Sequence, residues 1–332
     1  MDRVIFNPQL KLLWHWDKIN AWLKSGDTVP VLVEVSPTNY CNANCPWCFY
    51  IYEHCDAKNE SKKKHISREA MLKTLADMRT LGVKAINWTG GGEPTLHPNF
   101  NEFSEAAYNL GYSQGIFTNA LDYNLNKINP KHFEWIRISV TNKGITGIDT
   151  RLLKHYREAS PETTIGVCLS LIKSDYDKLP EMVRQARDLG FNYFQVRPAL
   201  QKSYKNQEPI DVPYHLKEFE TPDFKVFLSE YKFDESTKPK SYDICYGHFF
   251  CPAIDYRGEV NVCMYRLSED DYVMGNIHDQ SFIDIWNSAK RKLIKNRKLV
   301  DANCQNCCKN HEINKVLYHI KHPDRHSNID FI

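Results

Sequence analysis

Residues 30–48 read PVLVEVSPTNYCNANCPWC, an apolar run followed directly by a loop that carries three cysteines. Branched apolar side chains bounded by proline predict a β-strand over residues 30–36. The cysteines, Cys41, Cys45 and Cys48, follow a Cys-x3-Cys-x2-Cys spacing. Three thiolates on one loop can hold three irons of a four-iron cluster and leave one iron open. The spacing therefore indicates a metal site that acts on a bound molecule.

Zinc is the alternative occupant of this loop, with His54 or Cys55 as the fourth ligand. Zinc loops more often use paired Cys-x2-Cys units, which this spacing does not provide. The cysteine pattern taken alone therefore favours an iron–sulfur cluster and leaves the zinc interpretation open.

Strands and helices alternate after this loop. Short β-branched runs predict strands, and apolar residues at helical spacing predict helices between them. Six strands separated mostly by helices favour parallel pairing, and hence an α/β sheet or barrel. The expected strands cover residues 30–36, 84–89, 113–118, 135–140, 164–171 and 192–197, and the expected helices cover residues 8–24, 67–81, 99–110, 148–158, 176–189 and 282–298.

The composition excludes several classes of protein. Of the 332 residues, 42% are hydrophobic and 25% are charged, as in ordinary folded domains. The 43 Lys and Arg residues nearly balance the 41 Asp and Glu residues, so no strong field favours nucleic acid or a membrane surface. No apolar run approaches the roughly 18 residues of a membrane span, and the first residues lack a signal-peptide core. We expect a cytoplasmic protein with no nucleic-acid or membrane partner.

The 11 cysteines are unevenly distributed along the chain. Cys168 stands alone in the middle, whereas the others gather near the two ends. A disulfide framework would not leave the middle nearly empty, and reducing compartments disfavour disulfides. Two separate metal sites explain the distribution. The first group is Cys41, Cys45, Cys48 and Cys55, and the second is Cys245, Cys251, Cys263, Cys304, Cys307 and Cys308.

A second motif follows the second expected strand. Residues 91–94 read Gly-Gly-Glu-Pro, and Trp47 stands directly before the third cysteine of the first loop. These features, in this order, resemble the radical S-adenosylmethionine (radical SAM) superfamily. The resemblance implies a partial (β/α)6 TIM-like barrel over residues 31–200, preceded by a helical segment at residues 1–30.

The resemblance also implies a [4Fe–4S] cluster on Cys41, Cys45 and Cys48, with SAM bound at the open iron. A reductant such as flavodoxin or ferredoxin would supply an electron for the cleavage of SAM to a 5′-deoxyadenosyl radical, which abstracts a hydrogen from the substrate. Glu93 would accept a hydrogen bond from the SAM ammonium group. Glycine lets a backbone approach a ligand closely. The remaining expected SAM contacts are Trp47, Gly91, Gly92 and, at the ends of later strands, Asn119, Ser139 and Arg197, although each of these three polar residues is as often an ordinary polar group.

The carboxyl-terminal cysteines resemble a known extension of these enzymes. Cys245 and Cys263, followed by Cys304-x2-Cys307, resemble the SPASM and Twitch regions that hold auxiliary iron–sulfur clusters. The stretches at residues 274–277 and 281–287 resemble the Gly-Asn-Ile and Ile-Trp-Asn segments of those regions. The resemblance implies a small, loop-rich α+β cluster-binding domain at residues 244–332, joined to the barrel by a bridge at residues 201–243.

A full SPASM region has seven cysteines for two clusters, and this chain has six there. We therefore expect one auxiliary [4Fe–4S] cluster, as in the Twitch arrangement, on Cys245, Cys263, Cys304 and Cys307. Cys251 and Cys308 are alternative ligands for this cluster. A structural zinc knuckle is the competing interpretation.

The substrate is less determined than the chemistry. We expect the oxidation or dehydrogenation of a sugar-like small molecule, supported by the auxiliary cluster. The alternatives are a peptide maturase that crosslinks or epimerises a ribosomal peptide, and a non-enzymatic metal-binding scaffold. Only 40 residues precede Cys41, which argues against the leader-binding domain of many maturases. Cys168 is a candidate hydrogen donor to a substrate radical, although a lone strand cysteine is more often a small core residue. The oligomeric state is undetermined.

Overall fold

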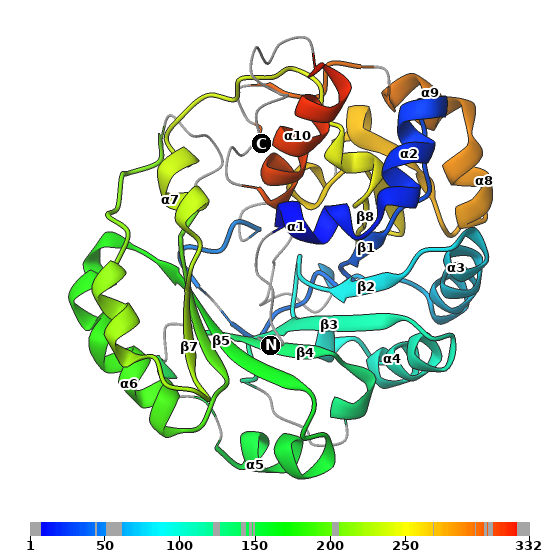
Figure 1. Cartoon of the computed structure of the whole chain (residues 1–332). Coiled ribbons are helices and arrows are strands. Elements are labelled where there is room, and N and C mark those ends of the chain that lie inside the picture. Colours follow the sequence, from blue (N-terminus) through cyan, green and yellow to red (C-terminus); the bar gives the residue numbers. More distant parts are fainter. Residues whose placement is uncertain are drawn as a thin grey trace.

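The computed structural model shows a curved sheet with helices on its outer face (Figure 1). Within the described residues, seven parallel strands run in chain order: β1 (Leu32–Val35), β2 (Ala85–Trp88), β3 (Ser113–Thr118), β4 (Trp135–Ser139), β5 (Thr164–Leu171), β6 (Tyr193–Pro198) and β7 (Lys225–Leu228). The structure describes residues 8–43, 45–50, 62–121, 127–140, 144–145, 148, 150–200, 206–267, 269–295, 297–301, 304 and 308–323.

Helices α3 (Arg68–Leu81), α4 (Phe100–Asn109), α5 (Thr150–Ala159) and α6 (Leu179–Asp188) cover the outer face of this sheet (Figure 1). Strand and helix alternate along the chain, so each crossover returns to the same side of the sheet. This arrangement confirms the expected α/β fold with a partial barrel. No helix among the described residues has the length and apolarity needed to cross a membrane.

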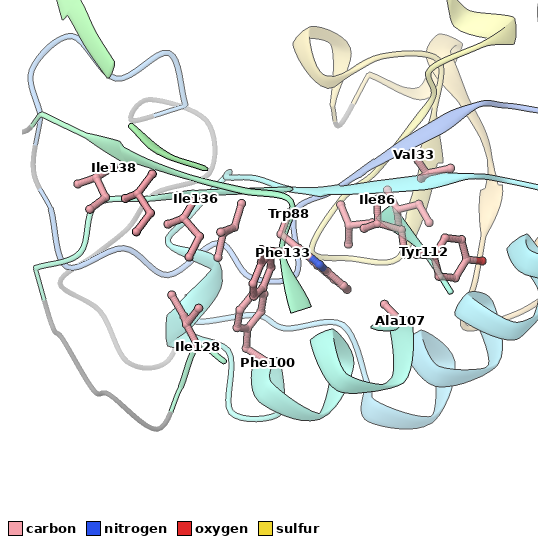
Figure 2. Close-up of a cluster of buried hydrophobic side chains, with 14 of the residues drawn as sticks. Val33, Ile86, Trp88, Phe100, Ala107, Tyr112, Ile128, Phe133, Ile136 and Ile138 are labelled. Carbon is pink, nitrogen blue, oxygen red and sulfur yellow. The ribbon is translucent and has the colours of Figure 1, made fainter. Parts of the chain in front are cut away.

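Side chains along each strand point alternately toward the helices, where they form the core, and toward the barrel interior. Outward side chains such as Val33, Ile86 and Ile136 are fully buried against the helices (Figure 2). The side chains between them, such as Glu34, Asn87 and Arg137, face a cavity instead. Because successive side chains of a strand point to opposite faces, the same short strands supply both the core and the site.

The carboxyl-terminal region extends the same sheet. Its strands are β8 (Ala253–Ile254), β9 (Glu259–Asn261) and β10 (Val273–Asn276), and β8 pairs in parallel with β1. The sheet order is therefore β10-β9-β8-β1-β2-β3-β4-β5-β6-β7. This pairing fixes the second cysteine group at one edge of the barrel.

An ion pair anchors this region to the amino-terminal segment. Arg291 donates to both carboxylate oxygens of Asp27, at 2.6 and 2.9 Å, and Lys295 donates at 2.9 Å. The Arg291 guanidinium lies 3.7 Å from the centre of the Trp286 ring, and its side chain is only 1% exposed. The contact joins residues more than 260 positions apart, so it holds the two ends of the chain together.

Four elements differ from the expectations from sequence. The helix expected at residues 8–24 is two helices, α1 (Pro8–Leu13) and α2 (Trp16–Ser25), and the helix expected at residues 282–298 breaks at Ser288 into α8 (Phe282–Asn287) and α9 (Ala289–Lys295). The bridge at residues 201–243 contains β7 and α7 (Glu230–Glu235), and α10 (Lys309–Lys321) follows the last cysteines. The first break lets Leu12 of α1 and Trp22 of α2 enter the same apolar cluster.

Candidate active site

One cavity of about 1100 Å³ lies inside the barrel, and its lining includes the residues at the carboxyl ends of the strands. Such strand ends gather the catalytic groups of barrel enzymes. The cavity brings together nearly all the residues expected to hold the first cluster and SAM, which are far apart in sequence. Those lining it are Cys41, Cys45, Cys48, Gly91, Gly92, Glu93, Asn119, Ser139 and Arg197.

The Gly-Gly-Glu turn packs directly on the loop of the first cysteines. Gly91 donates its backbone N–H to Ser36 Oγ at 2.6 Å, and Glu93 donates its N–H to the Tyr40 carbonyl at 2.8 Å. A Cβ at Gly92 would lie 2.3 Å from the same Tyr40 carbonyl oxygen. Gly92 is therefore required because the two loops approach too closely for any side chain.

The Glu93 carboxylate is buried, with 4% of the residue exposed. Its Oε1 accepts from the Thr95 and Thr118 hydroxyls, each at 2.7 Å, and its Oε2 accepts from the Asn119 N–H at 2.7 Å. Desolvation raises the pKa of Glu93, and these hydrogen bonds oppose the rise. The carboxylate is thus held in one orientation at the cavity wall, with Oε2 less heavily engaged than Oε1.

The other expected SAM residues fall into two groups. Asn119 lies at the first cysteine, and its Nδ2 is 3.6 Å from Cys41 Sγ and 2.9 Å from Asn42 Oδ1. Ser139 lines the cavity from the end of β4. Trp47 is half-buried on the cysteine loop and is not among the described residues that line the cavity.

Residues from later segments of the chain also line the cavity, and we call this set the far wall: Gln195, Arg197, Tyr231, Lys232, Met264 and Tyr265. They come from β6, α7 and the loop after Cys263. The cysteine loop touches this wall, because the Tyr50 hydroxyl donates to the Met264 carbonyl at 3.3 Å and the Phe49 and Tyr265 ring centres lie 5.2 Å apart. Desolvation raises the pKa of Tyr50 well above its usual value. The far wall is therefore assembled from segments that are distant in sequence.

Deeper in the barrel, an arginine is surrounded by aromatic rings. The Arg137 guanidinium lies 4.9 Å from the ring centres of both Phe117 and Trp135, and its Nε donates to the Tyr193 hydroxyl at 2.9 Å. The Tyr193 ring fits because its strand neighbour is Gly166, where a Cβ would lie 2.0 Å from the ring. The electron-rich ring faces attract the cation and help to hold it at the cavity.

Four cysteines of the second group lie close together at the edge of the sheet. Desolvation raises the pKa of the Cys245 and Cys263 thiols, and the neighbouring thiols raise that of Cys263 further. Desolvation also raises the pKa of Cys304 to about 11. Thiols that resist ionisation become thiolates when a metal group binds and releases their protons, so this buried donor set fits an iron–sulfur cluster. The four are Cys245, Cys263, Cys304 and Cys308.

Lys240 is the residue of this second site that the sequence did not single out. Its Nζ donates to Cys304 Sγ at 3.1 Å and to Cys308 Sγ at 3.6 Å. Desolvation lowers the pKa of Lys240, but the Cys308 and Cys304 thiols outweigh it and the pKa lies well above its usual value. A cation at this position stabilises thiolate ligands.

The structure separates the two alternative ligands of the second cluster. Cys308 lies with Cys245, Cys263 and Cys304, whereas Cys251 lines the barrel cavity. Cys307 and Cys55 lie outside the described residues, so the expected ligation by Cys307 stays a prediction. No three His, Cys, Asp or Glu side chains in the described part of the chain are placed to hold one metal ion.

Cys168 is 3% exposed on β5, with Ser139 and Gln195 as its strand neighbours. It does not line the cavity, although its thiol is the strongest influence on the pKa of Arg197, which it raises. The residues missed from sequence are Arg137, Tyr231, Lys232, Lys240, Met264 and Tyr265. For Arg137 a signal was present, because a charged residue alternates with apolar ones in the stretch Trp135-Ile-Arg-Ile-Ser.

Two protein-family models match the chain. The model of the radical SAM superfamily matches residues 35–177, and that of SPASM, an iron–sulfur cluster-binding domain, matches residues 245–308. The first match contains the Cys41–Cys48 loop and the Gly-Gly-Glu turn. The second runs from Cys245 to Cys308, the two outermost described members of the second cysteine group.

Known proteins are similar to the chain at low identity. A tungsten-containing aldehyde ferredoxin oxidoreductase cofactor-modifying protein of Pyrococcus furiosus is 24% identical over 295 residues, covering 76% of this chain and 80% of that protein. An S-adenosylmethionine-dependent nucleotide dehydratase of Selenomonas ruminantium is 29% identical over 166 residues, covering 48% of this chain and 52% of that protein. The SAM-bound crystal structure of SuiB from Streptococcus suis superimposes with a TM-score of 0.62 at 17% identity, covering 89% of this chain and 75% of that one. The likeness to SuiB shows a shared fold.

Proposed function

Because the chain belongs to the radical SAM superfamily and carries a C-terminal SPASM domain, we propose that this enzyme oxidises a small, sugar-like molecule. Its cofactors would be SAM and [4Fe–4S] clusters. When bound, they would supply the reductive cleavage of SAM to a 5′-deoxyadenosyl radical, the species that removes a hydrogen atom from the substrate. Loss of a second electron and a proton then completes a dehydrogenation. The observation that carries the proposal is the single cavity that collects the three cysteines, the Gly-Gly-Glu turn and a separate polar wall.

The residues around the first cysteines have defined roles in this proposal. Cys41, Cys45 and Cys48 would hold the SAM-binding cluster as three thiolate ligands. Glu93 would accept a hydrogen bond from the SAM ammonium group through Oε2, since Oε1 already accepts from two hydroxyls. Asn119 orients Cys41 through its side-chain amide.

The second site supplies the other half of the reaction. Cys245, Cys263, Cys304 and Cys308 would give one auxiliary cluster a complete set of thiolates. A closed cluster of this kind exchanges electrons instead of binding substrate, as the second oxidation step requires. The Tyr50 hydroxyl donates to the carbonyl of Met264, which directly follows Cys263, so the loop of the first cysteines contacts the chain of the second site.

The size of the cavity supports a small substrate. Pockets for small molecules span roughly 300–1,000 Å³, and this cavity of about 1100 Å³ has room for SAM and one further small molecule. A peptide maturase remains the competing outcome, and product analysis decides between the two.

The experiment is iron and sulfide analysis of anaerobically purified enzyme, with a parallel assay of 5′-deoxyadenosine formation. We expect about eight irons per chain in the wild type and about four in the Cys41→Ala/Cys45→Ala/Cys48→Ala variant, because only the auxiliary cluster remains. The variant should form no 5′-deoxyadenosine. About four irons in the wild type and none in the variant would show that the auxiliary cluster is absent. A colourless, zinc-loaded protein would contradict the proposal that the protein is a radical SAM enzyme.

A further inference from the structure

Two side chains outside the second cysteine group donate hydrogen bonds to its sulfur atoms. Lys240 Nζ donates to Cys304 Sγ at 3.1 Å and to Cys308 Sγ at 3.6 Å. Asn314 Nδ2 donates to Cys245 Sγ at 3.3 Å. Because one ammonium contacts two sulfur atoms, those two thiols must lie close together. The three sulfurs, which the proposed function gives to the auxiliary cluster, thus each have a nitrogen donor.

The chain around Asn314 holds its amide in one orientation. Asn314 is fully buried in α10, and its Oδ1 accepts the backbone N–H groups of Tyr246 at 2.6 Å and Gly247 at 2.8 Å. A Cβ at Gly247 would lie 2.7 Å from the Asn314 Cβ, so only glycine lets the two segments approach this closely. Because two N–H groups bind the amide oxygen, the amide nitrogen is the atom that faces Cys245.

Contacts on either side of Lys240 hold its backbone in place. Before it, the chain leaves α7 in a turn in which Lys238 donates its N–H to the Glu235 carbonyl at 3.1 Å. After it, the Tyr242 hydroxyl lies 2.8 Å from His311 Nδ1, and the two rings stack with their centres 5.6 Å apart. The segment is therefore tied to α7 at one end and to α10 at the other, and the Lys240 ammonium reaches the sulfurs from between them.

The charge that Lys240 brings to these sulfurs is positive. The side chain is half-buried, so water screens its ammonium incompletely. Acids of the same part of the chain pair with other lysines, Glu235 with Lys315 at 3.6 Å and Asp243 with Lys298 at 2.6 Å. An electron added to a cluster on these thiolates would add negative charge beside Lys240, and an ammonium within hydrogen-bond distance stabilises that charge.

We infer that Lys240 is a positioning residue that raises the reduction potential of the auxiliary cluster through its hydrogen bonds to Cys304 and Cys308. Hydrogen bonds to the sulfurs and net charge are among the features by which proteins set such potentials. The inference rests on the proposed function, in which the auxiliary cluster takes up one electron. A higher potential makes the cluster a better electron acceptor, as the oxidation of a substrate requires.

The test is an anaerobic redox titration of the auxiliary cluster, followed by electron paramagnetic resonance. The parent protein is the full chain with Cys41→Ala/Cys45→Ala/Cys48→Ala, in which the auxiliary cluster alone gives the signal. At the midpoint potential of the parent, we expect at least a tenfold lower ratio of reduced to oxidised cluster in Lys240→Met. For a one-electron couple this is a shift of about 59 mV to lower potential. Lys240→Arg keeps the charge and should titrate close to the parent, and the matched control Lys238→Met removes an exposed lysine and should titrate like the parent.

Iron analysis separates a shifted potential from a damaged site. If Lys240→Met keeps about four irons per chain, as the parent should, an unchanged potential overturns the inference, and so does an equal shift in Lys238→Met. If Lys240→Met loses iron, Lys240→Gln is titrated in its place, because it keeps an N–H donor without the charge and should shift the potential in the same direction. Loss of iron from Lys240→Gln as well would show that Lys240 only holds the site together and would overturn the inference.

The same experiment distinguishes failure of the inference from failure of the proposed function. A parent without iron would show that the auxiliary cluster itself is absent, and both would then fail. The titration needs no substrate, so an unchanged potential in Lys240→Met would leave the proposed oxidation standing. Formation of 5′-deoxyadenosine by the holoenzyme tests SAM cleavage separately and should be unaffected in Lys240→Met, because Lys240 contacts the second cysteine group.

Discussion

The two walls of the cavity were built in different ways. The wall around the first cysteines comes mainly from the cysteine loop and the Gly-Gly-Glu turn, which contact each other through Ser36 and Tyr40, with Asn119 added from the end of β3. The far wall comes from β6, α7 and the SPASM region, which meet only when the chain has folded. A wall made of local motifs keeps one fixed chemistry, whereas a wall assembled from distant elements can vary its substrate without disturbing that chemistry. The predictions below test this contrast.

The largest effect is expected at Gly92. Gly92→Ala places a methyl group 2.3 Å from the Tyr40 carbonyl oxygen, so the turn and the cysteine loop must separate. A displacement of about 1 Å at a catalytic group can cost roughly 100-fold in rate, and we expect at least that loss in 5′-deoxyadenosine formation. Gly26→Ala is the control for activity: at φ 69° alanine is strained there too, but its methyl group meets no described atom within 4 Å and Gly26 does not line the cavity, so only stability should fall. Normal activity in Gly92→Ala would show that the two loops need not touch.

The second-largest effect is expected at the ion pair between Asp27 and Arg291, which anchors the SPASM region to the amino-terminal segment. Asp27→Asn leaves the buried Arg291 without its carboxylate, and we expect a loss of about 3 kcal/mol in the free energy of unfolding. For a chain of this size that corresponds to roughly 4 °C in thermal midpoint, measured anaerobically by circular dichroism. Asp271→Asn, at an ion pair whose aspartate side chain is 84% exposed, is the control and should change little.

The same anchor gives a pH dependence. Desolvation would raise the pKa of Asp27, but hydrogen bonds from Arg291 and Lys295 lower it below its usual value. The folded pKa lies below the unfolded one, so the stabilisation is complete above about pH 4. It is lost as the pH falls through the lowered pKa. The difference in midpoint between wild type and Asp27→Asn should therefore shrink below pH 4, and a constant difference would contradict the assignment.

A smaller effect is expected when Glu93, which lies on the wall around the first cysteines, is replaced by glutamine. Glu93→Gln removes the charge expected to meet the SAM ammonium, and a hydrogen bond to a charged group contributes about 2 kcal/mol. We expect roughly 30-fold weaker SAM binding by equilibrium dialysis. Desolvation raises the pKa of Glu93, so wild-type SAM affinity should fall with decreasing pH at a higher pH than for an ordinary glutamate. Glu93→Gln should lack this fall.

The smallest effect is expected deep in the barrel on the side of the far wall. Gly166→Ala places a methyl group 2.0 Å from the Tyr193 ring and forces the ring away from Arg137. Overpacking of this kind costs about 1–3 kcal/mol. We expect the free energy of unfolding, measured by thermal unfolding, to fall by an amount near the lower end of this range, because the Tyr193 ring borders a cavity and can move into it. The rate of SAM cleavage should stay within a few-fold of wild type. Combining Gly166→Ala with Tyr193→Leu should recover part of the loss, and strict additivity would contradict the clash.

Much of the first site could be predicted from sequence because its chemistry is local. Cys41, Cys45 and Cys48 fall within eight residues, and the Gly-Gly-Glu turn directly follows a strand whose period is readable. The second site was harder to predict from the sequence. Cys308 and Cys251 could not be ranked from spacing, since the ligand choice depends on how α10 returns the chain to the sheet edge. Lys240 lies in a polar bridge where no periodicity marks it.

The sequence by itself determined the parallel α/β architecture, the two cysteine groups and the radical SAM chemistry, because each depends on residues close together in the chain. Tertiary structure alone decided which residues from distant segments line the cavity together with the first cysteines. Arg197 and Lys232 line the same cavity because β7 pairs with β6 and Ser229, just before α7, bonds to the Val196 carbonyl. Parallel pairing brings the ends of consecutive strands together whatever the length of chain between them, so the far wall is a property of the assembled barrel.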